Sequence, residues 1–360
     1  MSSAALREAS GCRPAVDALQ TLCAPLFASL PRSDQRERFV KYVEGLLATE
    51  GRRSFRNMAA CLGGGPTLEQ RLHHFVSCST WDWMPVRRAL AARATAPVPP
   101  DAWVLRTVLA PKEGTSMVGV HRRHVPALGH SLNVQYAVGL WAVSGTECRP
   151  VNWRLLLPRT WTDDPERRAR TSIPDGSRPE TPTECAIGAY SGLMDDAEGQ
   201  LPGAPVVLAV DGVDVAAAVR HLRAARLPFL VKADPGDPLG ARAASDDGLL
   251  LFGSSTGTEP WPDEVWLTNL RDAGTPELTA LAASARAVDA SFAQVTDPLG
   301  ARDFTGRTFD GWHRHMTLVS VAHAAHAAAH TARAAAPADN RPSSSLVTES
   351  APFPGVADRV

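Results

Sequence analysis

The stretch from Trp103 to Val120 constrains the fold more than any other part of the sequence. It begins with an apolar run, Trp103 to Leu109, whose length and composition are typical of a buried strand. A Pro-Lys-Glu-Gly turn follows at residues 111–114, and a second strand is predicted to start at Met117. Two strand-like runs joined by such a turn predict a β-hairpin at the start of a sheet.

Apolar segments after this hairpin predict the remainder of an α/β domain. Residues 132–144 and 150–158 alternate or run apolar as strands do, and they would extend the hairpin into an antiparallel sheet. A later strand, helix and strand predict a parallel unit with a right-handed connection. The elements expected beyond residue 180 are helix 184–193, strand 205–214, helix 220–228, strand 229–234, strand 264–270, helix 276–296 and a last helix from 309.

Helical periodicity dominates the chain before this sheet. Residues 35–49 carry apolar side chains at helical spacing. A second helical run, residues 67–77, follows a Gly-Gly-Gly-Pro break, and within it Thr67 and Gln70 have the spacing of a capping box.

The Pro-rich segment 96–100 predicts a stiff linker between two domains. We therefore expect a helical N-terminal domain over residues 1–98 and an α/β domain over 99–335. Residues 336–360 are predicted to be a loosely ordered tail, because a composition rich in Ala, Pro, Ser and Asp leaves too little apolar surface to fold.

The hairpin and the segments after it resemble the DDE transposases of bacterial insertion sequences. The resemblance is carried by Pro111, Lys112 and the run Val118-Gly119-Val120-His121-Arg122-Arg123, and later by Gly306-Arg307 and Gly311-Trp312-His313. It covers roughly residues 30 to 330. It implies a ribonuclease-H-like mixed sheet flanked by helices, preceded by a helical N-terminal domain.

A Trp-Asp-Trp motif at residues 81–83, within the segment 70–90, is also similar to the family. In that family the surrounding module contributes to binding DNA ends. The alternative, which we favour, is that the aromatic side chains pack between helices. The apolar residues concerned are Phe75, Trp81, Trp83 and Val86.

The resemblance also implies a chemistry, in which three acidic residues hold two divalent ions that cut and join DNA. Arg106 stands where the first acid belongs. The second position falls at the end of strand 205–214, where Asp211 is the nearest acid and an ungapped alignment gives Ala209. The third belongs to a Tyr-x2-Arg-x3-Glu-x6-Lys signature, whose positions are occupied here by Ala282, Ala285, Asp289 and Thr296.

These replacements predict a transposase-like protein without an intact metal site, inactive in DNA cleavage and strand transfer and using no cofactor. Arg106 carries a permanent positive charge, and its planar guanidinium can bridge carboxylates. We therefore predict that Arg106 replaces the metal electrostatically and pairs with Asp211 or Asp289. The alternative is that Arg106 points outward and the two acids are solvated.

Charge bears on the partners of the protein. The chain has a formal net charge of −1, whereas proteins that grip DNA concentrate excess basic residues. This gives little support to DNA binding and leaves an alternative, a domesticated transposase fold that binds or transforms a small molecule, for instance in bacterial secondary metabolism. No run of about 18 uncharged apolar residues and no signal peptide is recognisable, which favours a cytoplasmic protein without a membrane partner.

Two groups of histidines have more than one interpretation. His121 and His124 lie three apart on a predicted strand and so face opposite sides, which favours surface or structural roles over metal binding. His323, His326 and His330 share one face of the last helix and fit either a metal or proton-transfer row or, as we favour, helix packing or a solvent-facing row.

Overall fold

The computed structural model describes residues 19, 22–23, 25–27, 30–125, 129–233, 248–254 and 263–335. The tail predicted for residues 336–360 lies outside the described residues. None of the helices in the described part of the chain is long and apolar enough to cross a membrane.

The N-terminal helices form where the sequence has helical periodicity. Their bounds are α2 Ser33–Ala48, α3 Phe55–Cys61, α4 Pro66–Ser77 and α5 Met84–Thr95. Helix α2 buries Phe39, Tyr42 and Leu46, which recur every three or four residues. The predicted capping box is wrong, because α4 already begins at Pro66, a residue suited to the first helical position, and Thr67 lies inside the helix.

The strands join into one mixed sheet, ordered β2-β3-β1-β5-β6-β8-β7, with β4 also paired to β3. Strand β1 pairs antiparallel with β3 and parallel with β5. A mixed sheet flanked by helices confirms the fold class expected from the sequence. The strands are β1 Ala102–Pro111, β2 His121–Val125, β3 His130–Ser144, β4 Glu147–Leu155, β5 Val206–Ala209, β6 Phe229–Ala233, β7 Leu250–Ser254 and β8 Glu264–Thr268.

The predicted hairpin of residues 103–120 is wrong. Strand β2 starts at His121 rather than Met117, and both β1 and β2 pair with the long strand β3. The turn after β1 is instead tied to the segment before α12. The Nζ of Lys112 donates to the carbonyls of Arg302 and Phe304 over 2.7 and 2.9 Å. Strand β1 pairs with β3 rather than with β2 because β3 is long enough to offer β1 ten register partners.

Three further differences concern the second half of the sheet and the helix beside it. Strand β5 ends at Ala209, earlier than predicted, and helix α9 (Val215–Ala224) begins five residues before the expected start. The side chain of Asp214 caps the N-terminus of α9 by accepting from the backbone N–H of Ala217. Strand β7 was not predicted; it is five residues long and alternates partly buried and exposed positions before the buried Ser254.

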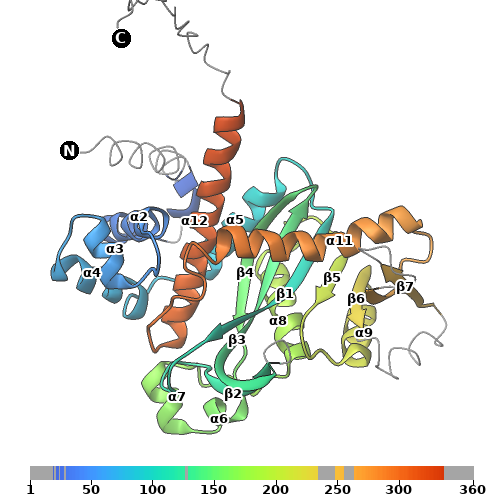
Figure 1. Cartoon of the computed structure of the whole chain (residues 1–360), viewed down its shortest axis with the longest axis horizontal. Coiled ribbons are helices and arrows are strands. Elements are labelled where there is room, and N and C mark those ends of the chain that lie inside the picture. Colours follow the sequence, from blue (N-terminus) through green and yellow to red (C-terminus); the bar gives the residue numbers. More distant parts are fainter. Residues whose placement is uncertain are drawn as a thin grey trace, which may run out of the picture.

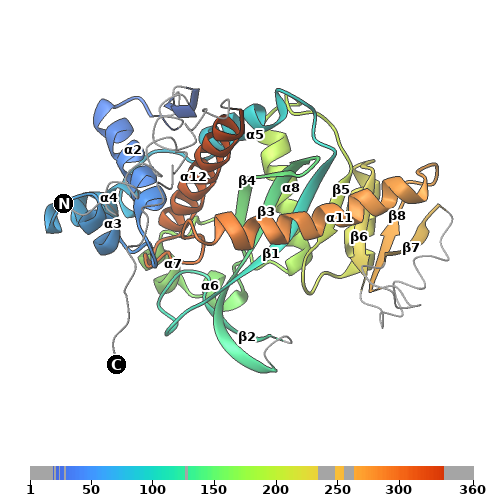
Figure 2. The ribbon, with the colours of Figure 1, turned by 45° about the horizontal axis from the view of Figure 1, so that its top comes forward.

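Helices cover both faces of the sheet (Figures 1 and 2). On β1, Val104 belongs to the apolar core beneath α11 and α12, whereas Leu105 belongs to the core beneath α8 and α9. Helix α11 lies across the strands on its face of the sheet (Figure 2). The remaining helices are α6 Arg159–Thr162, α7 Pro165–Thr171, α8 Pro182–Asp196, α11 Thr275–Ser291, the π-helix η3 Phe292–Thr296 and α12 Phe309–Ala335.

The N-terminal helices lie beside α12 (Figure 1). Aromatic side chains pack at the contact. Trp83 stacks on His313 with ring centroids 4.9 Å apart, and Trp81 stacks on Phe75 at 5.5 Å. The packing interpretation of the Trp-Asp-Trp motif is confirmed. One core cluster includes residues on both sides of the linker 96–100, and the division at residue 98 stays a prediction.

Candidate functional site

Arg106 on β1 and Asp289 on α11 form a bidentate ion pair. The Nε of Arg106 donates to Oδ1 of Asp289 over 2.7 Å, and Nη2 donates to Oδ2 over 2.5 Å. The Arg106 side chain is 19% exposed and the Asp289 side chain 51% exposed. The pairing predicted between Arg106 and Asp289 is therefore present, and the alternative in which Arg106 points outward is wrong.

The third guanidinium nitrogen of Arg106, Nη1, is hydrogen-bonded to the neighbouring strand β5. Its Nη1 donates to the carbonyl of Ala209 over 2.7 Å, and Ala209 is the register partner of Arg106 in the parallel pairing of β1 with β5. Asp211 lies two residues beyond the end of β5 and is exposed. Of the two acids proposed as partners of Arg106, only Asp289 is hydrogen-bonded to it.

The backbone at Asp211 is held by residues that the sequence reasoning missed. Its N–H donates to Oγ1 of Thr107 over 2.7 Å, and its carbonyl accepts from the hydroxyl of Tyr136 over 2.7 Å. Burial raises the pKa of Tyr136, so this hydroxyl stays protonated. The guanidinium of Arg123 lies over the Tyr136 ring, 4.5 Å from its centroid. The sequence feature that could have indicated this group is the family-like run from Val118 to Arg123, which contains Arg123.

Thr296 is separate from this group. It is fully buried in η3, and its Oγ1 lies 3.0 Å from Nδ1 of His323 on α12. Burial lowers the pKa of His323 to about 4, so the ring is neutral. His326 and His330 on the same helix are exposed. The predicted row of three histidines therefore divides into one packing residue and two at the surface.

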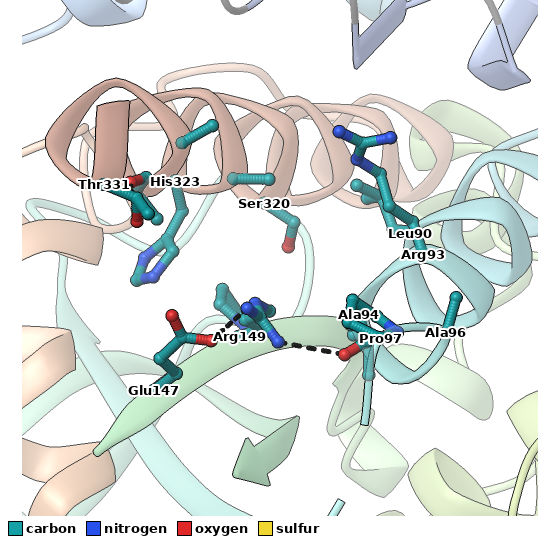
Figure 3. Close-up of a pocket in the computed structure, with 15 residues that line it drawn as sticks. Leu90, Arg93, Ala94, Ala96, Pro97, Glu147, Arg149, Ser320, His323 and Thr331 are labelled. Carbon is teal, nitrogen blue, oxygen red and sulfur yellow. Dashed lines mark hydrogen bonds and ion pairs between the residues drawn. The ribbon is translucent and has the colours of Figure 1, made fainter. Parts of the chain in front are cut away.

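A cavity of about 300 Å³ lies between α5, β4 and α12. Figure 3 shows Arg149 on one side, bound to Glu147 and to the carbonyl of Ala94, and His323 and Ser320 of α12 opposite. Leucine, valine, proline and alanine side chains form most of its wall. Such a mostly apolar space with a few polar groups has the character of small-molecule sites in proteins.

An Arg106→Met variant is expected to lower the free energy of unfolding by about 1 to 3 kcal/mol, because it leaves the Ala209 carbonyl and the Asp289 carboxylate without their donor. Exposure of Asp289 keeps this below the cost of breaking a fully buried pair. Urea unfolding measures the effect, and a double-mutant cycle with Asp289→Ala isolates the pair.

The matched control is Arg32→Met, which removes an exposed bidentate pair with Asp34. Its expected loss is much smaller than that of Arg106→Met, because an ion pair in solvent contributes little to stability. Equal losses in the two variants would contradict a stabilising role for the Arg106 pair.

Comparison with known proteins gives a family for this chain. A model of the DDE superfamily endonucleases matches residues 25–237. This segment contains α2 to β6, and with them Arg106, Ala209 and Asp211. No curated protein matches the chain significantly. The match covers more than half of the chain and agrees with the mixed, helix-flanked sheet, and the protein therefore belongs to the DDE superfamily of endonucleases.

Proposed function

We propose that this protein is a transposase-like member of the family that no longer cuts or joins DNA by two-metal chemistry. The observation that carries the proposal is the ion pair between Arg106 and Asp289. Its guanidinium engages both oxygens of the carboxylate and the Ala209 carbonyl. These oxygens are of the kind that a divalent ion would need.

The residues present do not fit a pair of divalent ions. Mg²⁺ and similar ions require several oxygen ligands, and the described residues contain no group of three His, Cys, Asp or Glu side chains placed to hold a metal. A divalent ion at Asp289 would have to displace the positively charged guanidinium of Arg106. We therefore infer that the positive charge of Arg106 neutralises Asp289 in place of a metal ion.

The purified protein is expected not to nick supercoiled plasmid in the presence of Mg²⁺ or Mn²⁺, because Arg106 occupies a ligand position. An Arg106→Asp variant is also expected to be inactive, since Ala209 supplies no second carboxylate opposite it. Agarose gels of plasmid topology measure both. Nicking by the wild-type protein that requires a divalent ion and is lost in Asp211→Asn would overturn the proposal.

The second candidate function is binding of a small molecule by a repurposed transposase fold. The cavity between α5, β4 and α12 favours it, because its wall is mostly apolar and carries Arg149, Glu147 and Ser320 (Figure 3). The two candidates differ in solution behaviour. A ligand for this cavity raises the melting temperature, whereas retained DNA binding gives an affinity that falls steeply with salt.

A further inference from the structure

A second cavity, of about 380 Å³, lies further along β4, beside Arg154 and Leu155. It is bounded by β4, by the first turns of α12 and by the segment 174–180. Leu155, Leu157 and Phe309 supply apolar wall. None of the residues around Arg106 and Asp289 lines it.

His313 presents one N–H group to this cavity. Nη2 of Arg87 lies 3.2 Å from Nδ1 of His313, and because a guanidinium can only donate, Nδ1 must be the acceptor. Burial and the charges of neighbouring arginines lower the pKa of His313 well below its ordinary value, so the ring is neutral. Its single ring proton therefore sits on Nε2.

The Nε2 group of His313 has no hydrogen-bond partner among the described residues. The residue is only 5% exposed, yet Nε2 is not among the fully buried polar atoms that lack a partner. The atom must therefore reach open space, and the cavity is the space that His313 lines. Since no described residue accepts from this N–H, whatever accepts from it must occupy the cavity.

Two arginines add further donors to the same wall. Arg154 binds Glu180 through Nε, at 3.0 and 3.1 Å, and through Nη2. Its Nη1 makes no hydrogen bond within the described residues. Arg178 also lines the cavity and forms no ion pair in the described part of the chain. Two positive charges and one negative charge leave the wall with a net charge of +1.

We infer that this cavity binds a small oxyanion, a carboxylate or phosphate group on a compact ligand, through Nε2 of His313 and the guanidinium groups of Arg154 and Arg178. Donors dominate the polar wall, and the carboxylate of Glu180 is already engaged by Arg154. Hydrogen bonds from cationic donors to an anionic oxygen are about twice as strong as neutral ones. The apolar side chains accommodate the body of the ligand.

The test uses the full chain labelled with ¹⁵N-histidine, titrated separately with inorganic phosphate and with acetate. The His313 ring is expected to show its proton on Nε2, and that signal is expected to shift as one of the two anions saturates the site. Arg178→Gln is expected to raise the dissociation constant of the anion about tenfold, which corresponds to the loss of one charge-assisted hydrogen bond. Arg170→Gln, which removes an exposed arginine outside the cavity, is expected to change nothing.

Three results would overturn the inference. The first is a His313 ring with its proton on Nδ1, and the second is a ring signal that neither anion moves. The third is an equal effect of Arg178→Gln and Arg170→Gln. A short DNA duplex forms a further arm of the experiment: competition between DNA and phosphate that disappears in Arg178→Gln would assign the cavity to a nucleic-acid backbone instead of a small ligand.

Discussion

An Arg87→Met variant is expected to lose about 3 to 5 kcal/mol of unfolding free energy, because several buried acceptors lose their hydrogen-bond donor at once. The Arg87 side chain of α5 donates to Oγ1 of Thr317 at 2.7 Å, to Oδ1 of Asn152 at 2.8 Å and to the Trp153 carbonyl at 2.7 Å. It also donates to the carbonyl of His313 at 2.9 Å.

The loss is large because methionine fills similar space but donates no hydrogen bond. Carbonyl and amide oxygens from β4 and α12 would remain buried without donors, at about 1 to 3 kcal/mol for each group. Burial lowers the pKa of Arg87 to about 9, so the guanidinium is still charged at pH 7. Urea unfolding followed by circular dichroism gives the midpoint and slope from which the difference is calculated.

The control for this experiment is Arg88→Met. Arg88 is the next residue on α5, is 40% exposed and pairs with Asp196 at 3.2 Å. We expect this variant to lose about 0 to 1 kcal/mol. Comparable losses from Arg87→Met and Arg88→Met would contradict the view that the buried network joins α5 to β4 and α12.

The second large effect is a loss of stability in mild acid. His315 and His323 are buried and neutral, and desolvation lowers the pKa of each from 6.5 to about 4. The two ring nitrogens of His315 lie 2.9 Å from the Tyr42 hydroxyl and 2.9 Å from the Gly300 carbonyl. An added proton would leave the ring charged in an apolar environment and remove its acceptor.

The direction follows from the protons that each state binds. Between pH 6.5 and about 4 the unfolded chain takes up protons at these histidines and the folded protein does not, so the free energy of unfolding falls as the pH is lowered. The loss is complete near the folded pKa of about 4 and amounts to about 3 kcal/mol for each histidine. Above pH 6.5 these two histidines make no further contribution to the pH dependence of the free energy of unfolding.

Urea unfolding at a series of pH values tests this expectation. A His315→Gln variant is expected to have a shallower slope between pH 6.5 and 4, whatever its stability at pH 7. His330→Gln, which changes an exposed histidine of α12, serves as the control and should keep the wild-type slope. A slope that His315→Gln leaves unchanged would exclude His315 as a source of the acid sensitivity.

Local patterns predicted the elements better than their pairing. The apolar run at Trp103 and the alternation over residues 132–144 correspond to β1 and β3, and the helical spacing after residue 33 to α2. The hairpin was wrong, because strand pairing depends on which long-range partner offers the most register positions, and β3 offers ten. The start of α4 was missed because Pro66 and Thr67 carry competing start signals.

The candidate site divides in the same way. The sequence alone determines that a permanent cation stands at position 106 and that carboxylates stand at positions 211 and 289, because these follow from residue type and family-like spacing. Only the tertiary structure decides that Asp289 and the Ala209 carbonyl receive the guanidinium while Asp211 remains outside. The reason is that the crossing of α11 over β1 and the register of β1 with β5 fix which side chains meet, and both arise from the packing of segments more than a hundred residues apart.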